Sequence, residues 1–237
     1  MLIIMHQTSI TPSSEHDRPV IRPVGCEVFF LPVSLRMPLK FGHEVIHHLT
    51  SMRVRMTVVN AAGDRYEGWG ETPLSANWAW PGELAFETRL TAMQNLAGDL
   101  AHAWACLPEQ GHAMEVGHAF LEHHLPEILK TFNRTHAAAL NHQPLPMLAA
   151  LVTLSAFDIA LHDAYGQSVS LPVYETYNAR FMSRDLSHYL QPADDATISF
   201  AGKYPADFLT QPRKQLTTWH LVGGLDPLTD ADRHGSE

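Results

Sequence analysis

Alternating apolar and polar positions early in the chain predict β-strands. The stretch 49–59 places four apolar side chains on one face of a strand, with a period of two: Met52, Val54, Met56 and Val58. An apolar stretch at 27–35 precedes it, and a strand-like stretch at 65–71 follows a turn at 60–64. These three segments predict a three-stranded antiparallel sheet.

Helical periodicity follows the strands. From 83 to 107, apolar residues recur at steps of three and four: Phe86, Leu90, Met93, Ala97, Leu100, Trp104 and Leu107. A weaker helical segment spans 113–132, where Pro126 should break or restart it. The segment 146–165 is apolar almost all round, and Gly166 should stop it. We expect an α+β domain in which the sheet is followed by a bundle of about three helices.

The ends of the chain lack such patterns. Residues 1–24 are polar and read as a flexible tail, 25–170 form the folded domain, and 171–237 read as an irregular segment.

Composition and charge narrow the function. The net charge of −9 argues against a nucleic-acid surface and favours a small-molecule partner. The apolar segments look too short to cross a membrane, and the two cysteines, which form no CxxC pair, read as reduced and buried thiols. We therefore expect a cytoplasmic protein.

The segment His43-Glu44-Val45-Ile46-His47 matches the HExxH pattern of zinc hydrolases. That chemistry needs both histidines on one face of a helix. Here Pro38 and Gly42 precede the motif and a strand follows at 49, so a zinc site on His43, Glu44 and His47 is a remote alternative.

Asp158 and His162 stand four residues apart on the most apolar helix. A buried acid–histidine pair is either catalytic or a satisfied structural pair, and the structural interpretation is favoured.

Two loops should leave the same end of the sheet, at 36–42 and 72–82. They would bring a cluster of basic and indole side chains together, and these are our candidate substrate-binding residues: Arg36, Lys40, Trp78 and Trp80. A cation beside indoles suits an acidic or ring-bearing ligand. The alternative is that the tryptophans cap a local core.

Taken in order, several segments resemble the N-terminal capping domain of the enolase superfamily, in its mandelate racemase and muconate lactonizing branch. These are Arg36-Met37-Pro38-Leu39, Gly68-Trp69-Gly70-Glu71, the stretch 156–166 (AFDIALHDAYG) and Trp219-His220-Leu221-Val222-Gly223-Gly224.

The resemblance implies a cap whose two loops close over a small carboxylate substrate. The family's base and its Mg²⁺ ligands lie on a following barrel of about 200 residues or more. Only 71 residues follow Gly166, without a Lys-x-Lys pair. We therefore expect no catalytic residue and no metal ligand in this chain, which reads as a cap truncated before its barrel. A stand-alone binding module for a small molecule or a protein is the alternative. Both the truncated cap and the stand-alone module could form a homo-oligomer.

Overall fold

The computed structural model describes residues 18–41, 44–194, 197–210, 212–219 and 227–233. Its sheet has the antiparallel order β1 (Ile21–Phe41), β2 (Glu44–Asn60) and β3 (Arg65–Pro73), as predicted. The four alternating apolar side chains of β2 are fully buried. The expected α+β fold is confirmed.

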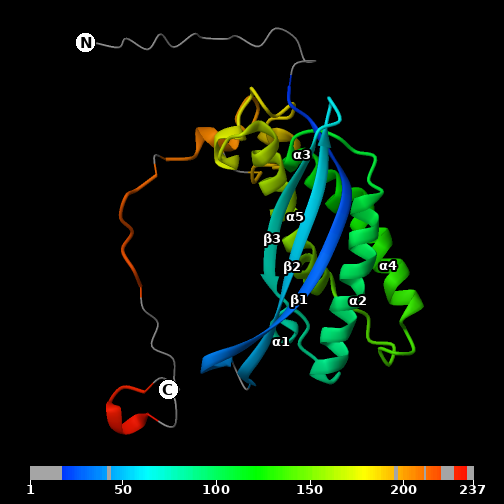
Figure 1. Cartoon of the computed structure of the whole chain (residues 1–237), viewed down its shortest axis with the longest axis vertical. Coiled ribbons are helices and arrows are strands. Elements are labelled where there is room, and N and C mark those ends of the chain that lie inside the picture. The colour runs from blue at the N-terminus through cyan, green and yellow to red at the C-terminus, as the bar shows by residue number, and fades with distance from the viewer. Residues whose placement is uncertain (1–17, 42–43, 195–196, 211, 220–226, 234–237) are drawn as a thin grey trace.

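Helices cover one face of this sheet (Figure 1). A short helix, α1 (Ala76–Ala79), precedes α2 (Phe86–Ala105). After α2 come α3 (Ala113–Ala119), a π-helical turn η2 (Phe120–His124), α4 (Leu125–Thr135) and α5 (Met147–Val169). Helices α2 and α5 pack on the sheet, α2 against β1 and α5 against β2 and β3.

Two glycines of β3 set the distance between the sheet and α5. A Cβ atom at Gly68 would lie 2.2 Å from the Ala160 carbonyl oxygen, and one at Gly70 would lie 2.0 Å from the Ala156 carbonyl oxygen. On α5 the facing residues are alanines at steps of four: Ala156, Ala160 and Ala164. The Gly68-Trp69-Gly70 segment therefore permits close contact between strand and helix backbones.

The strands extend beyond the predicted bounds. Ile21, placed in the flexible tail, begins β1, is buried and exchanges two backbone hydrogen bonds of 3.1 Å with Gly111. The predicted loop at 36–42 is strand as far as Phe41, because Leu39 and Lys40 pair with Ile46 and Val45 of β2. A register shift between Ser34 and Leu39 accommodates the extra residues.

The helix predictions also need correction. Of the two outcomes predicted for Pro126, the structure has the restart and not a break: the π-helical turn η2 leads directly into α4, which begins at Leu125 with the proline in its first turn. Helix α5 passes Gly166 and ends at Val169, and its C-cap Ser170 has a left-handed φ of 56°. By length and composition, α5 could cross a membrane, contrary to our expectation, but 50% of the tested window is buried and it packs as the core helix. Cys106, expected to be buried, is exposed.

The segment after α5 is partly folded onto the domain. Four of its side chains are buried: Thr176, Phe181, Met182 and Leu186. Glu115 of α3 anchors it, since its Oε1 accepts hydrogen bonds from the Ser183 N–H (2.5 Å), the Ser183 hydroxyl (2.9 Å) and the Arg184 N–H (3.0 Å). Residues 202–206 still contact this segment, since the Leu186 N–H donates to the Lys203 carbonyl oxygen (2.7 Å) and the Ala206 N–H to the Tyr177 carbonyl oxygen (3.0 Å). Only after them does the chain run away from the domain (Figure 1), with Trp219 93% exposed. Residues 220–224 of the predicted Trp219–Gly224 signature lie outside the described residues.

The Glu115 carboxylate should hold this segment in place. Replacing Glu115 by alanine leaves four donors without their acceptor, the three named above and the His112 N–H, which donates to Oε2 (3.2 Å). We expect faster amide hydrogen exchange at Ser183 and Arg184. The expected loss of stability is about 1–2 kcal/mol. Glu122→Ala, at an exposed position on η2, is the control and should change neither quantity; equal effects from both substitutions would contradict the anchoring role.

Candidate functional site

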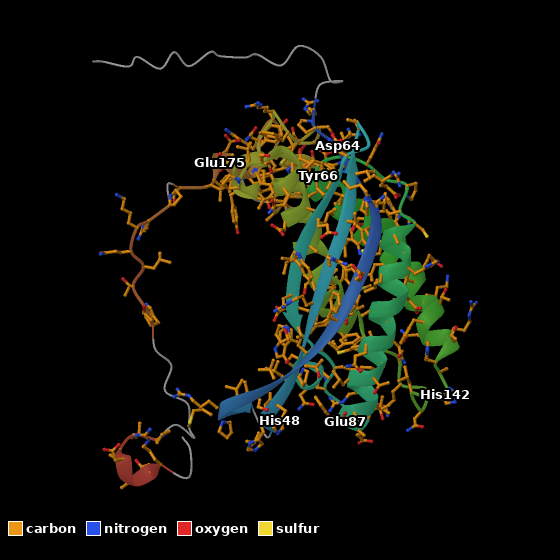
Figure 2. The ribbon with its side chains drawn as sticks, viewed as in Figure 1. His48, Asp64, Tyr66, Glu87, His142 and Glu175 are labelled. Atoms are coloured by element: carbon orange, nitrogen blue, oxygen red, sulfur yellow. The ribbon has the colours of Figure 1, made fainter. Side chains whose placement is uncertain are left out.

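A cavity of about 470 Å³ lies between the long β1–β2 hairpin and the start of the helical layer. The hairpin contributes Leu35, Leu39, Ile46, His47, His48 and Leu49, and the other wall consists of Pro73, Leu74, Ser75, Ala76, Asn77, Phe86 and Glu87. Figure 2 shows His48 and Glu87 at this end of the molecule, with Asp64 and Glu175 at the opposite end. The two segments predicted as substrate loops therefore share one cavity.

A buried arginine fixes the wall formed by α1. Arg89 is 6% exposed and donates from Nη1 to the Trp80 carbonyl oxygen (2.5 Å) and from Nη2 to Asn77 Oδ1 (2.9 Å). Its Nη1 also lies 3.5 Å from the Ala76 carbonyl oxygen. Carbonyls at the C-terminal end of a helix carry partial negative charge, so they stabilise a guanidinium in place of a carboxylate. Arg89 thereby ties the 72–82 segment to α2.

Sequence reasoning missed Arg89, although a signal for it exists. The residue lies three after Phe86 and four before Met93, which places a cation on the apolar stripe of α2. A charge at such a position must find polar partners inside the fold. The histidines His47 and His48 were likewise not assigned to this cavity.

The predicted site residues take different positions. Trp80 is 5% exposed and belongs to the core, whereas Trp78 is 49% exposed. Arg36 is exposed on β1, and the backbone of Lys40 lies in the same strand, its side chain being outside the described part of the chain. The three whose side chains are described, Arg36, Trp78 and Trp80, do not line the 470 Å³ cavity, although their neighbours in sequence do.

The described part of the HExxH segment is not helical. Glu44 begins β2 and His47 lies within that strand, while His43 falls outside the described residues. Within the described ranges, no group of three or more histidine, cysteine, aspartate or glutamate side chains could hold a metal ion. Glu44 and His47 therefore lie on a strand and not on the helix that the zinc-hydrolase pattern requires.

The Asp158–His162 pair lies away from this cavity and contacts the segment that follows α5. His162 Nε2 is 3.8 Å from Asp158 Oδ1, and its Nδ1 shares a 2.8 Å hydrogen bond with the Tyr177 hydroxyl. Burial lowers the pKa of His162, and the nearby Asp158 carboxylate opposes that shift. The pair holds Tyr177 against the core helix, which supports the structural interpretation.

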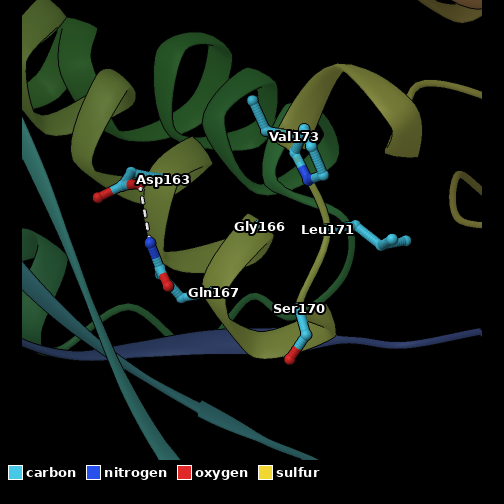
Figure 3. Close-up of a pocket in the computed structure, with 7 residues that line it drawn as sticks. Asp163, Gly166, Gln167, Ser170, Leu171 and Val173 are labelled. Atoms are coloured by element: carbon cyan, nitrogen blue, oxygen red, sulfur yellow. Dashed lines mark hydrogen bonds between the residues drawn. The ribbon is translucent and has the colours of Figure 1, made fainter.

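A second cavity, of about 480 Å³, lies at the end of α5 (Figure 3). Asp163 faces it, but its two carboxylate oxygens already accept hydrogen bonds, from the Trp69 N–H (2.8 Å) and from Gln167 Nε2 (3.4 Å). Asp163 satisfies a backbone donor of the edge strand β3, so its role here is structural.

Comparison with known proteins finds a likeness in structure only. No family model and no curated protein sequence matches this chain. Among solved structures, it is similar to the dipeptide epimerase from Enterococcus faecalis V583 in complex with Mg and a dipeptide (15% identity, TM-score 0.39), covering 67% of this chain and 35% of that chain.

Two further solved structures give similar values. An enolase-superfamily member from Roseovarius nubinhibens ISM has 20% identity and a TM-score of 0.36, over 65% of this chain and 33% of that one. A mandelate racemase/muconate lactonizing enzyme-like protein from Rubrobacter xylanophilus has 18% identity and a TM-score of 0.35, over 66% and 33%. This chain therefore spans about a third of each of these structures. Identities and TM-scores this low carry no argument about function, which must rest on the chain's own residues.

Proposed function

We propose that this chain is the covering part of an enolase-superfamily enzyme, which closes over a small carboxylate held by a catalytic barrel. The barrel, with its base and its Mg²⁺ ligands, would belong to another polypeptide or to another part of a longer one. In the complete enzyme, the metal would stabilise the negative charge that develops when a proton is removed next to the carboxylate.

The observation that carries this proposal is an unpaired apolar stripe on α5. Leu148, Leu151 and Ile159 lie on one face of the helix at steps of three and eight, with Ser155 between them, and they are 42%, 37% and 47% exposed. The opposite face of α5 is buried against β2 and β3. Such an apolar stripe on an otherwise buried helix is typical of an interaction surface.

The test begins with the DNA on either side of this coding sequence. We expect an open frame there that encodes a Lys-x-Lys pair and three acidic residues on successive strands. Co-expressed with the chain as a separate polypeptide, that segment should co-purify with it in equal amounts. Unrelated sequence on both sides would count against the proposal.

A substitution in the stripe tests the docking surface itself. Ile159→Asp puts a charge where the barrel should pack, so we expect co-purification to be lost, a drop in affinity of at least about 100-fold. Leu121→Asp places the same charge at an apolar residue of η2 that is 36% exposed and outside the stripe, and it should leave co-purification intact. If both substitutions leave it intact, α5 is not the docking surface.

A stand-alone binding module remains the second candidate, because the 470 Å³ cavity is formed entirely by this chain. Such a module would be monodisperse and fully folded without any barrel, and Ile159→Asp would not change its sedimentation. Sedimentation of the chain alone and of this variant separates the two functions.

A further inference from the structure

The walls of the 470 Å³ cavity are mainly hydrocarbon. Five of its side chains are large and apolar and come from three elements: Leu35, Leu39, Ile46, Leu49 and Phe86. Its floor includes Leu74 and Ala76, which are 1% and 0% exposed. A volume of this size lies within the range of about 300–1,000 Å³ typical of small-molecule sites.

The polar groups of the cavity are few and partly engaged. Asn77 Oδ1 accepts the hydrogen bond from Arg89, and His48 Nδ1 shares a 3.1 Å hydrogen bond with Ser34 Oγ. A sugar-like group that enters the cavity would lose many hydrogen bonds to water and would find only these few partners. Its burial is therefore unfavourable.

The charge of the described lining disfavours an anionic group in the interior. Among the side chains that the structure describes, no lysine or arginine lines the cavity, and Glu87 places a carboxylate in the first turn of α2. That carboxylate repels a second negative charge and already complements the positive end of the helix. An uncharged apolar group avoids both problems.

We propose that this cavity binds the apolar group, a branched aliphatic or phenyl group, of a small-molecule ligand. This proposal rests on the proposed function only in treating the ligand as the enzyme's substrate. In that case, the cap selects substrates with an apolar side group over polyhydroxylated acids. Any charged group of the ligand stays outside the cavity.

Methyl NMR of the chain alone tests this proposal with three defined probes. 3-Phenylpropionate and gluconate carry the same charge and differ in their hydroxyl groups, and 3-phenylpropanol has the phenyl group without the charge. We expect the two phenyl compounds to shift the methyl signals of Leu35, Leu39, Ile46 and Leu49 with millimolar dissociation constants, and gluconate to bind at least about tenfold more weakly.

Two matched variants locate the binding. Leu39 and Val45 are both exposed apolar residues of the hairpin, 54% and 46% exposed, but only Leu39 lines the cavity. Leu39→Ser should weaken the binding of the phenyl compounds at least about fivefold, and Val45→Ser should leave their dissociation constants unchanged.

Three outcomes would overturn the proposal: gluconate binding as tightly as phenylpropionate, equal losses in both variants, or methyl shifts that depend on protein concentration and not on the probes. The last outcome would mean that a second copy of the chain fills the cavity. Because the chain is tested without a barrel, failure here is distinct from failure of the docking test on α5.

Discussion

Replacing Gly70 by alanine is expected to destabilise the fold by about 3 kcal/mol, because the added methyl group has no space. It would lie 2.0 Å from the Ala156 carbonyl oxygen and 2.7 Å from the Ala160 backbone nitrogen. Both are backbone atoms of α5, so the helix would have to move away from the sheet. Thermal unfolding followed by circular dichroism should show a melting temperature lowered by roughly 6–12 °C.

Gly98 is the matched control for this substitution. It lies within α2, and a Cβ added there meets nothing within 4 Å among the described residues. Because alanine favours helix more than glycine does, Gly98→Ala should be neutral or stabilising by up to about 1 kcal/mol. Similar losses in both variants would show that close approach to α5 is not what Gly70 provides.

Acidification from pH 7.5 to pH 5 should lower the free energy of unfolding by about 2 kcal/mol through His112 alone. This residue is 1% exposed, and burial, aided by the nearby His162, lowers its pKa from 6.5 to about 3. Between these values the unfolded chain binds a proton that the folded chain does not, so stability falls as the pH falls below about 6.5.

The surroundings of His112 explain why the folded state excludes the proton. Its Nδ1 accepts a hydrogen bond from the Met114 N–H (3.1 Å) as the N-cap of α3, so Nε2 carries the hydrogen and donates to Thr176 Oγ1 (2.9 Å). A proton on Nδ1 would abolish the cap. The rings of Tyr165 and Tyr177 and the carboxylate of Glu115, which accepts from the His112 N–H, complete the enclosure.

Urea denaturation at several pH values measures this effect. His112→Asn keeps an N-cap acceptor but cannot titrate, so its stability should fall less between pH 7.5 and pH 5 than that of the parent chain. Burial of His162 lowers its pKa too, so some pH dependence should remain. His142→Asn, at an exposed position with a positive φ that asparagine tolerates, should keep the full dependence. Equal slopes for the parent chain and His112→Asn would refute the assignment.

Local patterns in the sequence were sufficient to predict the three strands and the long helices, though not all of their bounds. The alternation in β2 predicted a half-buried strand, because successive side chains of a strand point to opposite faces. The segment of α5 is apolar on nearly all sides, which predicted a core helix. The four-residue spacing of Asp158 and His162 predicted a pair on one helix face. Each of these predictions depends on residues that lie close together in the chain.

The tertiary structure alone decided what surrounds the cavity. Backbone pairing across the hairpin converted the predicted 36–42 loop into strand, and packing placed Trp80 in the core and left Trp78 exposed. Arg89 reaches Asn77 across 12 residues, and His112 reaches Thr176 across 64. Such contacts depend on how the elements pack against one another, which no local periodicity encodes. The sequence by itself therefore determined the sheet and its helices, and only their packing determined where a ligand could bind.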